Sequence, residues 1–402
     1  MNRLAFLGLA ALLAGACQSD RVANPSSARA MTPDAALQAD GDWGGSGLPA
    51  PDARPLRVMQ YNLYLGANLG PIFQAPAEQV PMAIYLAWVE LQQTDFPARA
   101  GAIANQIAKV QPDLLGIEEV ARWSVSPDYT YGAPPTQPFA VQYDFLQTLL
   151  DSLAARGLVY TAPAVDATSD VTVPVLTGVN GDGVPTGVLV NFQDRDAVLV
   201  RAGVAFTDPQ HGVYQAAVPV VLGENTLYIR NGWSSVRASS GGRSFRFLVT
   251  HLNAEAGVVN GLQAGELLSV VQGETDPVIL AGDFNTGPGV APDFADAYRA
   301  FARAGFADLW LQRRPADPGL TNGPNDGVGY LDESGALVPW PSLDFRTRVD
   351  LVLVRDPLGP PQPVHAATFG YLPGDRTASG LWPSDHAAVG VTFELTKRPA
   401  DR

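Results

Sequence analysis

The feature that most constrains this chain is a series of short apolar runs that end or begin at polar residues. Val278–Ala281 leads into Asp283 and Asn285, and the run from Phe247 to Thr250 leads into His251. The same pattern places polar side chains at Asn62, Glu119, Asp350, Asp385 and His386. Such runs predict buried strands. Polar groups at the rims of stiff strands are typical of catalytic or metal-binding sites.

Strands and helices alternate after residue 56, which predicts a layered α/β protein with helices outside two packed sheets. Helices are expected at residues 84–110, 143–156, 262–272 and 295–304. Strands are expected at residues 57–62, 113–118, 188–192, 226–236, 244–251, 278–281, 349–355 and 387–395, the fourth and fifth paired across a turn at 238–242. Two segments, Asp166–Pro185 and Gln312–Leu343, are expected to be variable loops that set specificity.

The N-terminus resembles an export signal. Arg3 is followed by an apolar run from Leu4 to Ala16 that is too short to span a bilayer. The run ends at Cys17, the only cysteine of the chain, in a context similar to the bacterial lipobox. We therefore expect a signal peptide over residues 1–16, a lipid on Cys17, and an exported lipoprotein of the cell envelope, at the outer membrane or cell surface. An ordinary cleaved signal peptide, and hence a secreted protein, is the alternative.

Residues 17–55 are rich in Ala, Ser, Pro, Gly and Asp, and they predict a flexible tether ahead of one domain over residues 56–397. The formal net charge of −14 argues against a general nucleic-acid binder, because phosphate contacts need clustered Lys and Arg. A local basic groove would still be compatible with that total. A single cysteine leaves no partner for a disulfide within the chain. Separately, we expect the protein to be a monomer.

Six motifs resemble, in the same order, those of the endonuclease/exonuclease/phosphatase superfamily. They are Tyr61–Leu63, Asp113–Val120, Thr250–Asn253, Ala281–Asn285, Arg348–Asp350 and Ser384–His386. The resemblance implies a four-layer α/β/β/α sandwich of the DNase I-like type. It also implies metal-dependent hydrolysis of a phosphoester.

The resemblance assigns roles to the acidic and amide residues. Glu119 would bind a divalent cation with Asn62 nearby, and Asp385 would bind metal or buttress the site. Asp283 would align and deprotonate the attacking water, and Asn285 would hold the phosphate. Carboxylate and amide oxygens suit a hard cation, so Mg²⁺ is the expected cofactor, with Mn²⁺ and Ca²⁺ as alternatives.

The resemblance also assigns roles to the histidines. His386 would contact a phosphoryl oxygen, oriented by Asp350, and His251 stands where phosphodiesterase branches carry a second histidine. A carboxylate beside an imidazole favours the imidazolium, which stabilises charge on a phosphoryl group. Asp350 could instead form a salt bridge with Arg346 or Arg348.

Some positions depart from the family pattern or have simpler explanations. Glu118 stands where Gln is commoner and is expected to point away from Glu119. Asn260 replaces an Arg found three residues before Gln263 in many relatives, which weakens a nuclease-like assignment. His251 replaces the Tyr of the DNA-repair branch, which argues against abasic-site repair. Trp382, Tyr64 and Asn68 are candidates for the substrate mouth, whereas His211 and His365 are expected at the surface.

Three functions remain open from the sequence. The first is an extracytoplasmic phosphodiesterase acting on a lipid headgroup or small phosphoester, similar to a sphingomyelinase. The second is a secreted nuclease that degrades DNA or RNA, and an inositol-phosphate phosphatase is a further enzymatic alternative. The third is a catalytically inert surface binding protein. Retention of the whole polar set argues against the third, since an inert scaffold has no physical need for it.

Overall fold

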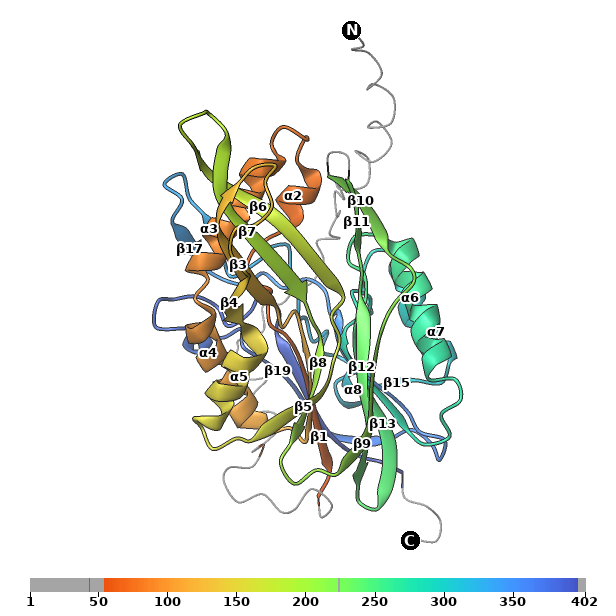
Figure 1. Ribbon diagram of the computed structural model, residues 1–402. Helices are drawn as coiled ribbons and strands as arrows, with labels where there is room; N and C mark the ends of the chain where they lie inside the picture. The colour runs from red at the N-terminus through yellow and green to blue at the C-terminus, as the bar shows by residue number, and fades with distance from the viewer. Residues whose placement is uncertain (1–42, 44–53, 223–224, 397–402) are drawn as a thin grey trace.

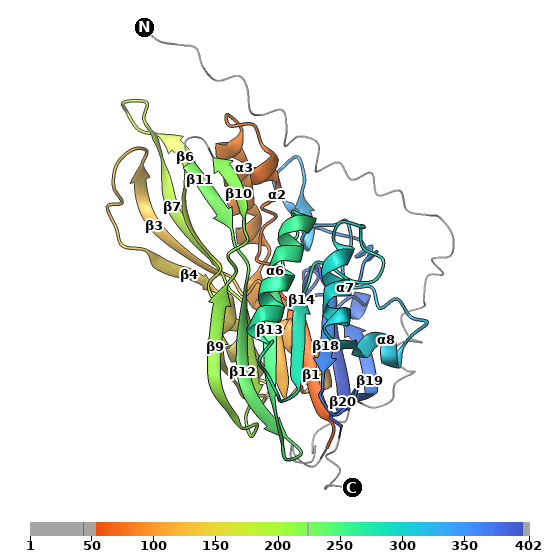
Figure 2. The same ribbon diagram turned by 90° about the vertical axis from the view of Figure 1, so that its right-hand side faces the viewer.

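The computed structural model describes residues 43, 54–222 and 225–396, and its centre is a pair of six-stranded sheets packed face to face (Figures 1 and 2). The expected signal peptide, Cys17 and almost all of the tether lie outside these residues. The first sheet has the order β19-β20-β1-β2-β8-β5 and the second the order β15-β18-β14-β13-β12-β9. The strands of the first sheet are β1 (Leu56–Asn62), β2 (Leu114–Glu118), β5 (Tyr160–Val165), β8 (Ala197–Arg201), β19 (Gln362–Phe369) and β20 (Ala388–Glu394). Those of the second are β9 (Phe206–Val213), β12 (Gly232–Ser240), β13 (Arg243–His251), β14 (Val278–Asp283), β15 (Ala307–Asp308) and β18 (Asp350–Arg355).

Smaller sheets extend one end of the sandwich. A four-stranded sheet of order β4-β3-β7-β6 and the hairpin β10–β11 lie at the same end of the molecule in both views (Figures 1 and 2). Their bounds, with those of a third small sheet, are β3 (Arg122–Thr130), β4 (Ala140–Asp144), β6 (Ser169–Val179), β7 (Pro185–Asp194), β10 (Val218–Leu222), β11 (Asn225–Ile229), β16 (Gly329–Leu331) and β17 (Leu337–Pro339).

Helices cover the outer faces of both large sheets. The helices are α2 (Gly70–Gln74), α3 (Val80–Gln93), α4 (Phe96–Val110), α5 (Phe145–Ala154), α6 (Gly257–Val270), α7 (Ala295–Arg303), α8 (Leu309–Arg313) and the 3-10 turn η2 (Pro373–Asp375). One buried apolar cluster joins α3, α4 and α5 to the first sheet, and another joins α6 and α7 to the second. A third fills the space between the sheets. This arrangement confirms the predicted four-layer α/β/β/α sandwich. None of the described helices has the length and apolar character needed to cross a bilayer.

Local physics explains where the elements differ from expectation. The helix expected over residues 84–110 is divided, because Asp95 adopts a left-handed backbone (φ 41°) and caps α4 by accepting a hydrogen bond from the backbone N–H of Ala98 at 3.2 Å. The loop expected at Asp166–Pro185 is largely the strand β6, whose Val173 and Val175 pack toward the α3–α5 core. That prediction was wrong, since alternate valines bury one face of a strand.

The remaining elements follow the predicted pattern with shifted ends. The strand expected at residues 226–236 is split between β11 and the start of β12. The predicted pairing of the next two strands is confirmed, with Ser240 opposite Arg243 next to the turn. The long segment Gln312–Leu343 carries only short elements, among them the hairpin β16–β17, and otherwise forms loops beside the site.

Candidate active site

Both large sheets end at a common rim, where the predicted polar residues gather. In the first sheet, Asn62 ends β1 and Glu119 directly follows β2. In the second, His251 ends β13 and Asp283 ends β14. Each of these strand pairs is parallel, so their C-terminal ends lie side by side. Asp350, at the start of the antiparallel β18, pairs with Asp283 in register.

The amide of Asn62 connects the two sheets. Its Nδ2 donates to Glu119 Oε1 at 2.9 Å and to Asp283 Oδ2 at 3.1 Å. Its Oδ1 accepts from the backbone N–H of Tyr64 at 3.0 Å, and Glu119 Oε2 accepts from the backbone N–H of Leu65 at 2.8 Å. The asparagine is fully buried. The Asn62 side chain therefore fixes the spacing between the Glu119 carboxylate of the first sheet and the Asp283 carboxylate of the second.

Asp283 lies between two imidazoles. Its Oδ2 is 3.7 Å from His251 Nε2 and 3.8 Å from His386 Nε2. His386 Nδ1 lies 2.9 Å from Asp350 Oδ2, the contact expected of an orienting carboxylate. Burial by itself would lower the pKa of His386, but Asp350 and Asp283 outweigh it and raise that pKa well above the usual range. His386 is thus an imidazolium at neutral pH.

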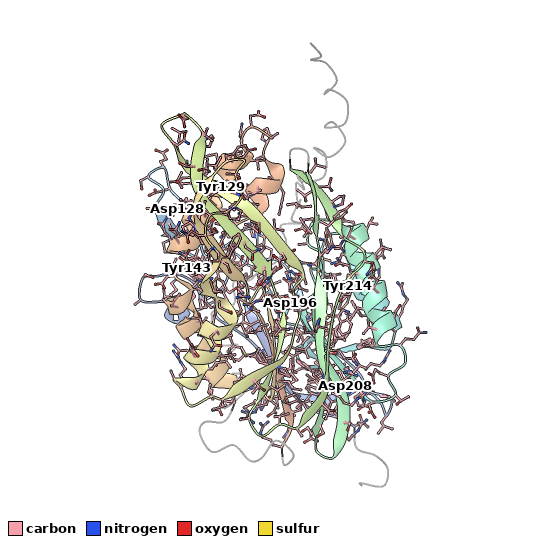
Figure 3. All side chains as sticks on the ribbon, viewed as in Figure 1. Asp128, Tyr129, Tyr143, Asp196, Asp208 and Tyr214 are labelled. Carbon is pink, nitrogen blue, oxygen red and sulfur yellow. The ribbon has the colours of Figure 1, made fainter. Side chains whose placement is uncertain are left out.

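His251 has a second set of carboxylates on its other side. Its Nδ1 is 4.0 Å from Oδ1 of Asp196, a residue that Figure 3 labels in the middle of the molecule. Asp196 lies between β7 and β8 and accepts a hydrogen bond from the backbone N–H of Glu119 at 3.3 Å. Burial by itself would lower the pKa of His251, but Asp283 and Asp196 raise it to about 9. The sequence analysis did not identify Asp196, which belongs to none of the six motifs.

Three of the predicted residues have backbones in the left-handed region that non-glycine residues seldom adopt, Tyr64 with φ 58°, Glu119 with φ 56° and Asn285 with φ 46°. Such strain persists where the surroundings fix it, commonly at functional sites. The backbone N–H of Asn285 donates to Asp283 Oδ1 at 2.9 Å, and its Nδ2 donates to the carbonyl of Leu252 at 2.9 Å. A primary amide has two N–H donors, so a second one remains for a phosphoryl oxygen.

Asp385 lies at the edge of the cluster. Its Oδ2 accepts from the backbone N–H of Gly327 at 2.9 Å, and its Oδ1 lies 3.3 Å from the Ser384 hydroxyl oxygen. The same hydroxyl donates to the carbonyl of Asn62 at 2.7 Å. Asp385 therefore contacts the loop at Gly327 through Oδ2 and lies beside the Ser384–Asn62 bond, which favours the buttressing role.

The donor set fits a hard divalent cation. Buried carboxylates are costly unless a cation or hydrogen bonds compensate them, and burial raises the pKa of Glu119 to about 7. Asp283, Asp350 and His386 also present ligand atoms within 4.8 Å of one another. Because Asp350 and His386 already bond each other, the carboxylates of Glu119 and Asp283, which Asn62 Nδ2 holds close together, are the better oxygen-rich pair.

Two more residues complete the site, and sequence patterns did not reveal them. The amide of Gln60 on β1 donates to Asp350 Oδ1 and to Glu118 Oε2, the latter at 3.1 Å. It therefore supports the carboxylate that bonds His386. The amide of Asn322, from the long loop, lies 2.9 Å from His386 Nε2. A doubly protonated imidazole requires the oxygen of that amide to face it. Gln60 sits inside an apolar strand, and Asn322 is far from every motif.

The structure shows the partners of Arg346 and Arg348 and the burial of Glu118. Arg348 pairs with Asp308 at 2.7 Å and Arg346 with Asp344 at 2.5 Å, so neither arginine takes the Asp350 carboxylate. Glu118 is fully buried, and burial raises its pKa well above the usual range, which makes it a neutral structural acid.

The residues proposed for the substrate mouth are mostly buried. Trp382 is 2% exposed and donates from Nε1 to the carbonyl of Trp340 at 2.9 Å, so its assignment to the mouth was wrong. Tyr64 is also buried and hydrogen-bonds Glu90, whereas Asn68 lines a surface cleft.

The two remaining histidines differ in their surroundings. His365 was expected at the surface but is half-buried, with its ring 5.6 Å from that of Trp43. His211 is exposed on β9, as predicted.

Known proteins resemble this chain along most of its length. No family model matches the chain. Human Nocturnin is 26% identical over 365 residues, which cover 85% of this chain and 66% of the human protein. Xenopus laevis Nocturnin is 24% identical over 86% of this chain and 74% of its own length. The chain thus spans about two thirds of the human relative.

Solved structures give a similar coverage at lower identity. TDP2 of D. rerio, complexed with a single-strand DNA product, is 15% identical, with a TM-score of 0.48 over 85% of this chain and 99% of that one. An endonuclease/exonuclease/phosphatase family protein from Leptotrichia buccalis is 14% identical, with a TM-score of 0.45 over 85% of this chain and all of the other.

The four-layer sandwich and the six ordered motifs that meet at one rim agree with the fold and the motif order expected from the resemblance to the endonuclease/exonuclease/phosphatase superfamily. The Nocturnin relatives extend that similarity over most of the chain.

The raised pKa values of two site residues lead us to expect that the stability of the protein without bound metal depends on pH. Between about pH 5 and 7 the folded state keeps a proton on Glu119 that the unfolded chain, with a pKa near 4.5, releases. Between about pH 7 and 9 it keeps a proton on His251 that the unfolded chain, with a pKa near 6.5, releases. Raising the pH through these two ranges is therefore expected to lower the free energy of unfolding. Mg²⁺ requires the ionised carboxylate, so its stabilising effect should grow as Glu119 loses its proton. Thermal unfolding in chelator and in Mg²⁺ at about pH 5, 7 and 9 measures both. An Mg²⁺-induced rise in Tm that stays constant from the lowest to the middle pH would contradict the prediction.

Proposed function

We propose that this chain is an exported phosphodiesterase that hydrolyses a phosphoester with Mg²⁺, and that a lipid on Cys17 holds it at the cell envelope. The observation that carries the proposal is the meeting of Glu119, Asp283 and His386 at one buried rim, linked by bonds of Asn62 and Asp350. A binding protein without catalysis gains nothing from burying this set of charges, whose desolvation is costly.

The residues divide the reaction among them. Asp283 accepts the proton of the attacking water while the water oxygen forms the new bond to phosphorus and the bond to the leaving oxygen breaks. His386 and His251, which flank Asp283, stabilise the developing negative charge of the phosphoryl group as imidazolium ions. To donate directly to a phosphoryl oxygen, His386 Nε2 exchanges its contact with Asn322 for the substrate. The free N–H of Asn285 orients a phosphoryl oxygen.

A divalent cation at this site would be held by Glu119, with Asp283 and Asn62 beside it. When bound, it supplies charge neutralisation for the phosphoryl oxygens and polarises the ester. Mg²⁺ suits a site with few protein ligands, because it keeps several of its waters.

A surface cleft supports a small or lipid-derived phosphodiester over a nucleic acid. The cleft has a volume of about 700 Å³, and its wall includes Asp326, whose neighbour Gly327 donates its backbone N–H to Asp385 at the edge of the site. Its walls include Met82, Leu86 and Trp340, and Glu90 and Asp326 are the charged residues among them. A cleft whose lining residues include no Arg or Lys offers a polyanion no charged contacts, whereas its apolar wall accepts an apolar alcohol.

A substrate panel tests the proposal. We expect Mg²⁺-dependent release of phosphorylated headgroups from phospholipid vesicles and hydrolysis of bis(para-nitrophenyl) phosphate, both abolished by chelator. Plasmid DNA, RNA and inositol phosphates form the other arms. Nicking of DNA at a higher kcat/KM than any lipid would establish the nuclease alternative. Silence of the correctly folded protein on every ester would reject the enzyme.

The location is tested separately. Radiolabelled palmitate should enter the full-length chain in a bacterial host, and Cys17→Ser should abolish that labelling. A chain that remains unlabelled and is released into the medium would show that the alternative, an ordinary cleaved signal peptide, is correct.

A further inference from the structure

Arg99 is a buried cation whose partners are backbone carbonyls. It lies on α4, outside all six motifs, and is 0% exposed. Its Nη1 donates to the carbonyls of Leu63 at 2.7 Å and Pro383 at 3.0 Å. Its Nη2 donates to the carbonyl of Tyr64 at 3.2 Å, and its Nε to that of Thr94 at 3.0 Å. Within the described part of the chain, no carboxylate lies at salt-bridge distance from it.

The carbonyls belong to two loops that carry site residues. Leu63 directly follows Asn62, and Pro383 precedes Ser384 and Asp385. A single nitrogen, Nη1, bonds one carbonyl of each loop, and so it joins segments 320 residues apart. The Ser384 hydroxyl makes a parallel link to the carbonyl of Asn62. Arg99 and Ser384 therefore hold the loops of the first and the last motif against each other.

Aromatic rings support the guanidinium. The rings of Phe96 and Phe145 stack with centroids 3.6 Å apart, and the Arg99 carbon Cζ lies 5.0 and 5.8 Å from them. The ring of Tyr64 lies 5.3 Å away. A planar fork of five donors can lie among rings and reach several carbonyls at once, whereas the compact ammonium of lysine cannot.

The energetics show that packing alone does not explain this residue. A buried cation without a counter-ion costs several kcal/mol in desolvation. Burial lowers the pKa of Arg99 only to about 10, so the side chain stays charged at neutral pH. An apolar side chain would fill the same space without that cost. What it could not do is hold the carbonyls of both motif loops.

We propose that Arg99 is a positioning residue for the reaction, which fixes the first motif loop against the last so that Asn62 and the Asp385–His386 segment meet in one geometry. This inference rests on the proposed function, because it concerns the same site. Misplacing a reacting group by about 1 Å costs about a hundredfold in rate.

The test compares Arg99→Lys with Arg243→Lys. Arg243 is also buried and begins β13, whose other end carries His251, so it lies at the far end of the sandwich and pairs with Asp356 at 2.6 Å. We expect both variants to lose stability, and Arg99→Lys alone to lose about a hundredfold in kcat with KM changed by less than about threefold. The Mg²⁺-induced rise in Tm should shrink for Arg99→Lys and persist for Arg243→Lys. Equal kcat and equal Mg²⁺ response in the two variants would overturn the proposal.

Chemical rescue separates positioning from general damage. Guanidinium ions at low millimolar concentration should raise kcat of Arg99→Ala, while sodium chloride at the same ionic strength should not. Absence of rescue in a folded Arg99→Ala variant would count against the proposal. If the Arg99 variants do not fold, Phe145→Leu loosens the aromatic support without removing a hydrogen bond, and it should lower kcat more than Phe393→Leu, a buried control in β20. If the wild-type protein hydrolyses no ester, the proposed function fails, and the Mg²⁺-induced change in Tm still decides the role of Arg99.

Discussion

Replacing Asp283 by alanine is expected to lower kcat for phosphodiester hydrolysis by about a thousandfold while the protein remains folded. The carboxylate is the proposed base, and it is buried between His251 and His386 at the end of β14. Its removal also takes away one of the charges that keep both imidazoles protonated. Steady-state kinetics on bis(para-nitrophenyl) phosphate at saturating Mg²⁺ measures the loss, and circular dichroism verifies the fold.

Two controls make the result specific. Asp283→Asn keeps the shape and the contact with Asn62 but cannot accept the proton, so its kcat should fall nearly as far. Asp356→Asn changes a buried acid that pairs with Arg243 away from the site, and its kcat should stay within about twofold of wild type. If Asp283→Ala kept more than about a tenth of the wild-type kcat, Asp283 would not be the base.

Gly282→Ala is expected to destabilise the protein by about 3 to 5 kcal/mol. Gly282 has φ 148°, and a Cβ at this position would lie 1.9 Å from the carbonyl oxygen of Thr250 on the neighbouring strand. The backbone between β13 and β14 would have to separate next to Asp283. Urea unfolding measures the change, and the loss of activity should exceed the fraction that unfolds.

Gly261→Ala is the matched control for that substitution. Gly261 lies within α6, where a Cβ would meet nothing within 4 Å. Alanine is the better helix former, so this variant should gain up to about 1 kcal/mol. A Gly282→Ala protein as stable as the wild type would show that β13 and β14 tolerate a wider spacing than the structure indicates.

The motif residues were predictable because each is fixed by its own strand. An apolar run that ends at Asp283 or His251 specifies both burial and rim position, and neighbouring parallel strands then bring the two together. The fold class followed from the same alternation. The division of the long helix at Asp95 was less accessible, because it depends on one left-handed residue.

The supporting residues could not be predicted, because each acts across a large separation in sequence. Asn322 reaches His386 from a loop that has no periodic pattern, and Asp196 approaches His251 from the short connection between β7 and β8. Arg99 looks like any polar residue of an amphipathic helix until its carbonyl partners are known. Tertiary contact of this kind leaves no local signal in a single sequence.

The amide of Asn62 spans the seam between the two sheets, and this has a consequence for how the enzyme could fail. The seam is tight: a Cβ on Gly116 of β2 would lie 2.8 Å from Val249 of β13. A side chain there would force the two layers to shift relative to each other, and the Asn62–Asp283 hydrogen bond between them would shift with the layers. Substitutions in the interior between the layers should therefore lower activity by more than their loss of stability explains, although they lie far from any group that touches substrate.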